Sequence, residues 1–494
     1  MALLGALLFT SLFYHQSPGI NLMLFDSVLL VYFFTPLSQR PQSSSTRIFL
    51  FCFILTIFGV VLSGSNLALA LNIIMTALLP AIVLYGNARS IHSLIGVSFY
   101  NATHAPFEFL KNKSGKMSAG FEWLWRYRYL VIPGVVIFIF LGIYAAANEV
   151  FANLIENTME GISELLQKIF HNLDFSIVVM MVMGFVISVV MIFRSVKESW
   201  ISRDREASME LIRRRRKVSS WFSNMIALKK EFISAVFLLV VLNLMIAILN
   251  AIDISQIWFG YSWQGEDFAQ MVHEGTGLLI FSILISIAVV LYYFRNNLNF
   301  YRNNVWLKRL AYLWIAQNAL LVISVLIRNY HYCKIFSLAD KRIGVFVFLL
   351  LVGFGLYTVF TKVRSRLTAF YLFRTNALAV VIVLTATSLI PWDIVIAKFN
   401  FSRSGKSFMF LEHMSQLSDK ALPYLDHDQE MLQQYTNAQF EEFKFRERNM
   451  TADEYYSIIQ NRKQQFIERC ESQSFLSWNL AEYLAYRELK QATE

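Results

Sequence analysis

Cysteine is scarce in this chain, with Cys52, Cys333 and Cys470 the only three among 494 residues. Because no CxxC spacing and no histidine cluster accompanies them, the sequence excludes a disulfide framework and a paired-cysteine zinc site. The sequence also lacks the full phosphate loop of nucleotide-binding enzymes and the GxSxG turn of serine hydrolases. We therefore predict no metal and no cofactor, and we favour a protein that is not an enzyme.

Charged residues are also few, at 16%, whereas apolar residues make up 56% of the chain. Apolar runs long enough to cross a ~30 Å hydrocarbon core recur along the sequence. The first apolar run has no basic residue before Arg40, so it lacks the charged start of a secretory signal. We predict an all-α, polytopic helical membrane protein with about eleven transmembrane helices, near 2–14, 20–37, 47–62, 66–86, 130–148, 174–194, 231–251, 272–294, 309–327, 343–361 and 375–392. The turn "HQSPG" between the first two either joins two spans or forms the tip of a re-entrant hairpin.

Lysine and arginine are distributed unevenly between the two sides of these helices. The connections after helices 2, 4, 6, 8 and 10, with the helix ends beside them, carry 27, and the opposite set carries 5. Basic loops stay in the cytoplasm, so the first set is predicted to be cytoplasmic. The N-terminus is then cytoplasmic, and the tail after Trp392 is outside the cytoplasm.

These helices and loops divide the chain into six segments. They are an N-terminal four-helix membrane segment, a cytoplasmic basic loop, helices 5 and 6, a cytoplasmic polybasic loop, a five-helix membrane core and an extracytoplasmic helical domain. In that order they cover residues 1–86, 87–129, 130–194, 195–230, 231–392 and 393–494.

The last segment is predicted to be a small helical domain. Its stretches "MSQLSDKALPYL" and "FLSWNLAEYLAYRELK" have apolar residues three and four positions apart, which is typical of amphipathic helices. Ser418 is a predicted helix cap, and Pro423 restricts the helix that follows it.

A histidine–glutamate pair, His273–Glu274, stands where a polar loop meets the predicted helix 272–294. The metalloprotease motif HExxH needs a second histidine at position 277, where this chain has Gly277. Two hypotheses remain. The glutamate is stabilised by the dipole at the start of the helix, or the pair takes part in proton coupling or ligand binding at the outer membrane surface.

Polar side chains also stand inside the apolar runs. Asp26 is an acid well within a predicted span, and carboxylates are costly enough in a membrane to be candidate functional groups. The alternative is a short or tilted helix that leaves Asp26 near the interface. The amides Asn72, Asn243, Gln317 and Asn318 either join neighbouring helices by hydrogen bonds or line a polar transport cavity with Asp26.

Two basic stretches are candidate binding surfaces. The first resembles a polybasic patch that attracts anionic lipid, and it consists of Arg213, Arg214, Arg215, Arg216 and Lys217. No nucleic-acid-binding fold accompanies it, so membrane lipids and not nucleic acid are the predicted partners. The second, on the opposite side, contains Arg328, Lys334 and Arg342. These residues either bind an anionic head group or pair with acidic residues.

Several stretches together resemble a known family. They are "MVHEGTGLLIFSILISIAVVLYYFRNNLNFY", the segment from "LAYLWIAQNALL" to "LYTVFTKV", "FLEHMSQLSDKALPYL" and "WNLAEYLAYREL". The chain is similar to bacterial membrane proteins of the domain-of-unknown-function family numbered 4173, which is related to family 4153, in a version typical of Bacteroidetes. The resemblance covers residues from about 230 to the end, and more weakly Ser17–Phe25.

The resemblance places His273, Glu274 and Gly275 on the family's helix-start motif. It places Tyr332, Leu338 and Arg342 on a tyrosine–leucine–arginine element. Relatives often read "YGLT" where this chain reads "FSLA", and the glycine is thereby lost. The family implies a bacterial inner membrane protein and no particular activity.

Two functional hypotheses follow. The first is a non-catalytic inner-membrane protein, transporter-like or a signalling or assembly subunit, whose C-terminal domain engages a periplasmic or membrane protein partner. The alternative is a membrane enzyme for a lipid-linked or head-group substrate, with His273 and Glu274 as acid and base and the second basic stretch as the anion clamp. The sequence does not predict an oligomeric state.

Overall fold

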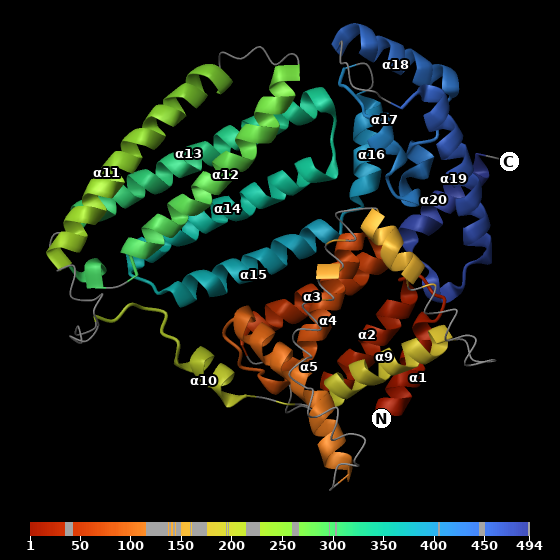
Figure 1. The fold of residues 1–494 in the computed structure, drawn as a ribbon, viewed down its shortest axis with the longest axis horizontal. Helices are drawn as coiled ribbons and strands as arrows, with labels where there is room; N and C mark the ends of the chain where they lie inside the picture. Colours follow the sequence, from red (N-terminus) through yellow and green to blue (C-terminus); the bar gives the residue numbers. More distant parts are fainter. Residues whose placement is uncertain are drawn as a thin grey trace. The chain divides into compact units, whose positions relative to one another are not determined.

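The computed structural model describes residues 1–34, 43–114, 175–213, 228–258, 266–443 and 450–492, apart from 194, 196, 296, 302–303 and 404–405. It also describes helical residues 137, 140, 141, 144, 150–158 and 160. For residues 107, 110–114, 175, 228, 256–257, 266–276 and 440–443 it describes the backbone alone. Apart from one isolated β-bridge, the regular elements of these ranges are helices, which confirms the all-α prediction (Figure 1).

Ten described helices are apolar enough to belong to a membrane. Six of them are also long enough to cross it: α3 (Ser44–Ser63), α4 (Asn66–Leu84), α11 (Leu228–Asp253), α13 (Val305–Phe336), α14 (Asp340–Ser365) and α15 (Ala369–Ser388). Four have shorter apolar stretches: α1 (Ala2–Phe13), α2 (Ile20–Phe34), α9 (Phe175–Ile192) and α12 (Glu266–Tyr293). They coincide with ten of the eleven predicted helices, and the eleventh, 130–148, lies largely outside the described residues. By the length and composition of its helices, the chain is a multi-pass membrane protein.

The described chain packs as two units. The first comprises Met1–Val61, Leu69–Arg205 and Ser474–Trp478, and the second comprises Leu62–Ala68, Glu206–Gln473 and Asn479–Glu494. The two units are defined by which residues pack together, and the six predicted segments by the side of the membrane on which they lie. The division into six segments therefore stays a prediction.

In the first unit, α1 and α2 form a short hairpin. The 12 residues of α1 rise about 18 Å, less than the ~30 Å of a hydrocarbon core, and α2 is described from Ile20 to Phe34. Asn21 holds the turn between them, because its Nδ2 donates to the carbonyls of Leu12 and Ser17, both at 3.1 Å. The length of α1 favours the re-entrant hairpin over two full spans. Either arrangement returns the chain to the same side, so the predicted orientation of the later helices is unaffected.

Close packing joins α1 to α9 in the same unit. A Cβ added to Gly5 would lie 2.2 Å from the hydroxyl of Ser188, and one added to Gly184 would lie 2.8 Å from the Cβ of Phe9. Small residues of this kind let membrane helices approach closely.

Within the predicted cytoplasmic loop 87–129, residues Ile91–Ser114 form helix α5. Asn101 anchors it, donating to the carbonyl of Val190 at 2.8 Å and accepting the backbone N–H of Ser195 at 2.8 Å. The following loop contains a short helix, α10 (Glu198–Glu206), whose buried Asp204 accepts hydrogen bonds from the backbone N–H of Arg89 and the hydroxyl of Ser90. Tertiary contacts thus order two stretches that composition alone predicts to be loops.

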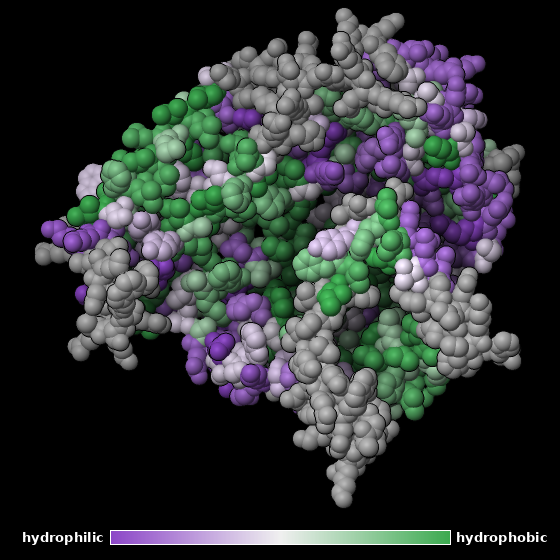
Figure 2. All heavy atoms as spheres, in the orientation of Figure 1, coloured by the Kyte–Doolittle hydropathy of each residue, from purple (hydrophilic) through white to green (hydrophobic). Residues whose placement is uncertain are grey.

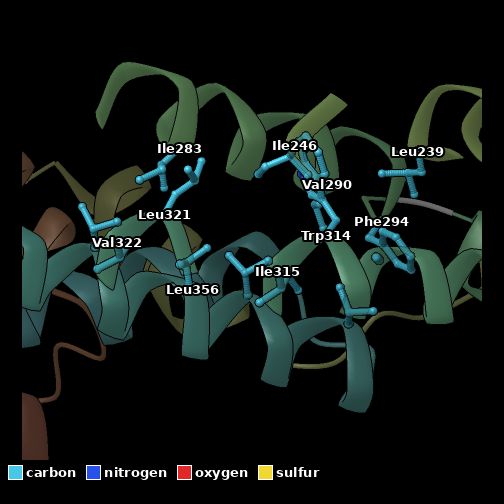
Figure 3. Packing of buried hydrophobic residues seen from close by; sticks show 14 of the residues in the cluster. Leu239, Ile246, Ile283, Val290, Phe294, Trp314, Ile315, Leu321, Val322 and Leu356 are labelled. Atoms are coloured by element: carbon cyan, nitrogen blue, oxygen red, sulfur yellow. The ribbon is translucent and has the colours of Figure 1, made fainter. Parts of the chain in front are cut away.

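In the second unit, helices α11 to α15 lie alongside one another, and their buried side chains form one apolar core (Figure 3). Leu239 and Ile246 from α11 belong to this core, together with Ile315, Leu321 and other residues of α13. The outward sides of these helices are also apolar, so the surface over them is largely hydrophobic in Figure 2. In α15 only 11% of the most apolar 18-residue stretch is buried, as expected of a helix that faces lipid.

The tail after α15 is helical, and its buried apolar residues form a core that also includes Ile343 of α14. That it is a separate domain stays a prediction. Its elements are α16 (Trp392–Ser402), α17 (Leu411–Ser415), the 3₁₀ helix η5 (Asp419–Tyr424), α18 (Gln429–Phe443), α19 (Ala452–Ser472), η6 (Phe475–Ser477) and α20 (Leu480–Gln491). Ser418 precedes η5, but its hydroxyl donates to Asp393 instead of capping the helix. Figure 2 shows a mostly hydrophilic surface over this domain. A hydrophilic surface of this kind suits contact with water.

Candidate functional site

A row of polar side chains runs along the contact between α11 and α13. On α11 the row consists of Asn243, Asn250 and Asp253, and on α13 of Gln317, Ser324 and Arg328. On each helix the first two of these residues are seven positions apart, so they lie on the same face of that helix. All six side chains are buried.

Three members of this row, Asn243, Asn250 and Gln317, are amides. Gln317 Nε2 donates to Asn243 Oδ1 at 3.1 Å, and Asn250 Nδ2 donates to the Gln317 carbonyl at 3.2 Å. Asn243 Nδ2 also donates to the carbonyl of Leu310. These bonds are those expected of amides that join neighbouring helices.

An ion pair ends the row. Arg328 Nη2 lies 2.6 Å from Asp253 Oδ1, and the two side chains are 8% and 4% exposed. The other carboxylate oxygen accepts from the hydroxyl of Ser324 at 2.6 Å, and Trp258 Nε1 donates to that hydroxyl at 3.3 Å. The carboxylate is therefore satisfied at both oxygens, and the Arg328 charge is already neutralised.

Arg342 closes the C-terminal end of α13. Its guanidinium donates to the carbonyls of Phe336 and Ser337 and lies 4.4 Å from the centre of the Tyr332 ring. A cation is favoured at this end of a helix. Lys334, the third predicted anion-binding residue, is exposed.

The turn between α13 and α14 is fixed to the tail domain. Asn400 of α16 accepts the backbone N–H of Leu338 at 2.7 Å and donates to the Leu338 carbonyl at 2.9 Å. Phe408 donates its N–H to the Ile335 carbonyl at 2.6 Å, and the hydroxyl of Ser337 donates to the Phe408 carbonyl at 2.8 Å. Ser337 has φ of 70°, which non-glycine residues rarely adopt, so these contacts hold an unusual backbone.

Asp26 belongs to the first packing unit, apart from the amide row. Its side chain is fully buried and accepts hydrogen bonds from Asn72 Nδ2 at 2.8 Å and Thr76 Oγ1 at 3.1 Å. Both partners are on α4. Asn318 is also separate, since its Nδ2 donates to the Trp314 carbonyl and it lies beside Ser286 of α12. The structure thus pairs Asn243 with Gln317, in a packing unit other than that of Asp26. A polar cavity shared with Asp26 stays a prediction.

A profile described as a domain of unknown function (DUF4153) matches residues 2–427 of the chain. The match covers well over half of the sequence. The chain belongs to the DUF4153 family. The comparison with curated proteins and the comparison with solved structures found no match.

The DUF4153 match differs in extent from the resemblance in the sequence. It begins near the N-terminus instead of at about residue 230, and it ends before α18. It is a match to the family that the resemblance gave as a relative of family 4173. The narrower assignment to family 4173 and to a Bacteroidetes version stays a prediction.

Two predicted sites lie wholly or partly outside the described residues. The side chains of His273 and Glu274 are among them, although the backbone places both residues in the second turn of α12, which begins at Glu266 and not at 272. Of the polybasic patch, Arg213 is described and exposed, and the other four residues are not described. Their predicted roles stay predictions.

Two buried charged residues, Asp253 and Lys362, could not be identified as site residues from the sequence. Asp253 follows the predicted end of its helix at residue 251 and so falls in a predicted loop. Lys362 is 2% exposed and donates to the Phe294 carbonyl at 2.7 Å, closing the end of α12 from the neighbouring helix α14. The seven-residue spacing of Asn243 and Asn250, matched by that of Gln317 and Ser324, is the signal that could have located the row.

Proposed function

We propose that this DUF4153 protein is a non-catalytic subunit of the bacterial inner membrane, of the signalling or assembly kind. Its C-terminal helical domain would lie in the periplasm and engage a protein partner of the envelope. Anionic lipids would bind the polybasic patch on the cytoplasmic side. The single observation that carries this proposal is the pair of hydrogen bonds between Asn400 and the backbone of Leu338.

Those bonds support the proposal because they join the tail to two membrane helices. Leu338 lies in the turn between α13 and α14, and Ile343 of α14 belongs to the same apolar core as the tail residues Met414 and Leu422. A force or binding event on the tail would therefore reach α13, which also holds the buried ion pair. A tail that hung from a flexible linker would transmit nothing.

The tail offers surfaces for a partner. Ile458 of α19 is 36% exposed, and Tyr483 and Leu484 of α20 are 45% and 43% exposed. Exposed apolar side chains surrounded by polar ones are frequent where proteins bind each other.

The orientation rests on the charge distribution, with the tail on the side that has fewer lysines and arginines. The rival enzyme hypothesis gains no support from the geometry. Of its proposed anion clamp, Arg328 is paired with Asp253 and Arg342 with helix carbonyls, so neither guanidinium faces a substrate.

Photo-crosslinking in intact cells tests the proposal. A photoreactive residue replaces Ile458 or Leu484 in the full-length protein, and Val241, an exposed apolar position on α11, serves as the lipid-facing control. We expect the tail positions to form a discrete protein adduct after illumination and the control to form none. Asn400→Ala should weaken the adduct, whereas Ser402→Ala, which removes an exposed hydroxyl of the same helix, should not.

The absence of a protein adduct at both tail positions would contradict the proposal. So would an adduct that Asn400→Ala leaves unchanged, because partner binding would then be independent of the contact between the tail and the membrane helices.

A further inference from the structure

Asp26 is a carboxylate for which the described part of the chain supplies no countercharge. It stands near the middle of α2 and is 0% exposed, and its two hydrogen-bond donors, Asn72 and Thr76, are both neutral. An ionised carboxylate in apolar surroundings is costly unless it is paired with a cation.

The described elements that contact α2 supply no such cation. Helix α1, helix α4 and the 475–477 turn contain no aspartate, glutamate, lysine, arginine or histidine. In α3 the one charged side chain is Arg47, in the first turn of that helix. The groups that face Asp26 within the described part of the chain are thus polar and uncharged.

The cluster also has more acceptors than donors. Asp26 presents two carboxylate oxygens, and Asn72 Oδ1 is buried with no hydrogen-bond donor among the described residues. Among the described residues these three oxygens receive two hydrogen bonds, one from Asn72 Nδ2 and one from the Thr76 hydroxyl. What the cluster lacks is positive charge or one more hydrogen.

The three side chains suit a carboxyl group in either protonation state. With the carboxylate ionised, the Thr76 hydroxyl donates to Asp26 Oδ1, as in the structure. With a proton on Oδ1, the new O–H donates to the Thr76 oxygen, and the Thr76 hydroxyl turns to donate elsewhere, since a hydroxyl is both donor and acceptor. Asn72 Nδ2 donates to Oδ2 in both states.

We propose that Asp26 is a proton-binding site of the membrane domain, held in both of its forms by Asn72 and Thr76. The proton comes from the aqueous phase and adds to Oδ1, and it returns there when the carboxyl group ionises. No other bond changes. The ligand is a proton and not a metal cation, because the Asn72 amide turns its nitrogen, and not its oxygen, toward the carboxylate.

The start of α2 gives the proton a short route. Asp26 is six residues from Ile20, which is about 9 Å of helix rise. The protein can therefore sense the proton concentration on one side of the membrane, which extends its role beyond the tail contacts described above. The site lies in the other packing unit, so the two proposals can fail independently.

Infrared difference spectroscopy of the full-length protein in lipid nanodiscs tests this inference. A protonated carboxyl group has a C=O stretching band separate from that of a carboxylate, and the band shifts in D₂O. We expect such a band to appear reversibly as the pH is lowered within the range of about 9 to 5. It should be absent in Asp26→Asn and present in Asp204→Asn, which removes another buried carboxylate of the same unit.

Two further variants guard against a folding defect. Asp26→Glu should restore a titrating band at a different frequency, and Thr76→Val should keep the band but move its frequency, because one hydrogen-bond partner of the carboxyl group is gone. The proposal is overturned if the Asp26→Asn spectrum equals that of the parent protein throughout this pH range. It is also overturned if replacing choline with sodium at constant pH abolishes the band, which would indicate a sodium site.

Discussion

Asp253 and Arg328 meet between two apolar helices, and each is the only charged partner that the structure describes for the other. Burying two charges costs more free energy than an exposed pair, and removing one of them leaves the other uncompensated. The pair therefore sets the register of α11 against α13 more than it adds stability. Ser324 and Trp258 complete the hydrogen bonding of the carboxylate.

Arg328→Met should destabilise the second unit by about 3 kcal/mol, because Asp253 is left buried and unpaired. The buried thiol of Cys333, 6% exposed, reports unfolding when it reacts with a thiol-specific dye in a Cys52→Ser, Cys470→Ser background. Lys334→Met removes the same charge from an exposed position of α13, and it should change stability by less than about 0.5 kcal/mol.

Adding Asp253→Asn to Arg328→Met should restore part of the loss, since the unpaired charge is then removed. Equal unfolding temperatures for Arg328→Met and the parent protein would show that the ion pair is not formed.

We expect two histidines to make the tail sensitive to acid. Burial lowers the pKa of His413, and the positive charges of Lys341 and Arg342 lower it further. The carboxylates of Asp340 and Asp393 act in the opposite direction. Burial likewise lowers the pKa of His427, although Asp426, Asp428 and a backbone bond at Tyr424 oppose it. The Nε2 atoms of both rings are buried without a partner among the described residues.

The fold therefore favours the neutral rings, whereas the unfolded chain binds protons below its ordinary pKa of about 6.5. The stabilisation is complete above that pH and is lost as the pH falls. Hydrogen exchange in residues 411–425, normalised to an unstructured peptide, should rise between about pH 7.5 and 5. The rise should be smaller in His413→Gln/His427→Gln and unchanged in His104→Gln, which alters an exposed ring in α5. An equal rise in all three proteins would assign the acid response to other groups.

Among the elements of the tail, α19 has the clearest local start signal. Thr451 Oγ1 accepts the N–H of Glu454 at 3.2 Å, and Glu454 Oε2 accepts the N–H of Thr451 at 3.0 Å. This reciprocal cap satisfies two backbone donors that the helix leaves open.

Thr451→Ala should cost about 1 kcal/mol and should speed hydrogen exchange in the first turn of α19. Ser457→Ala removes an exposed hydroxyl that bonds within the same helix, and it should leave that exchange unchanged. Similar exchange in the two variants would show that the cap contributes nothing.

The apolar helices could be predicted because a span of about twenty apolar residues is a property of local composition. Helix α13 runs 32 residues, to Phe336, well past its predicted end at 327. Its polar last turns are held by Asp253, Arg342 and the tail, which are not local. Helix α19 is not among the predicted helices, although "TADE" has the threonine and glutamate of a capping box and so could have predicted its start.

The candidate site was less predictable than the fold. The sequence identified Asp26, Asn243 and Gln317 as polar groups in apolar surroundings, because each stands out from its neighbours. It did not reveal that Asn72 and Thr76 would face Asp26, or that Arg328 would pair with a residue 75 positions earlier. Such pairings depend on how helices pack and on their register, which no local pattern contains.

At the scale of the whole molecule, we propose that the tail is an extracytoplasmic domain, joined by hydrogen bonds to the turn between α13 and α14. The tail has more acidic than basic residues, and the basic loops are predicted to lie on the opposite side of the membrane. Partner binding in the periplasm requires this orientation.

Single-cysteine labelling tests that claim most directly. In a background of Cys52→Ser, Cys333→Ser and Cys470→Ser, the exposed positions Glu430 and Arg213 are each changed to cysteine and treated with a membrane-impermeant maleimide in intact spheroplasts. The account predicts that Glu430→Cys reacts at once and Arg213→Cys reacts only after the membrane is permeabilised. Labelling of both positions from outside, or of Glu430→Cys only after permeabilisation, would contradict it.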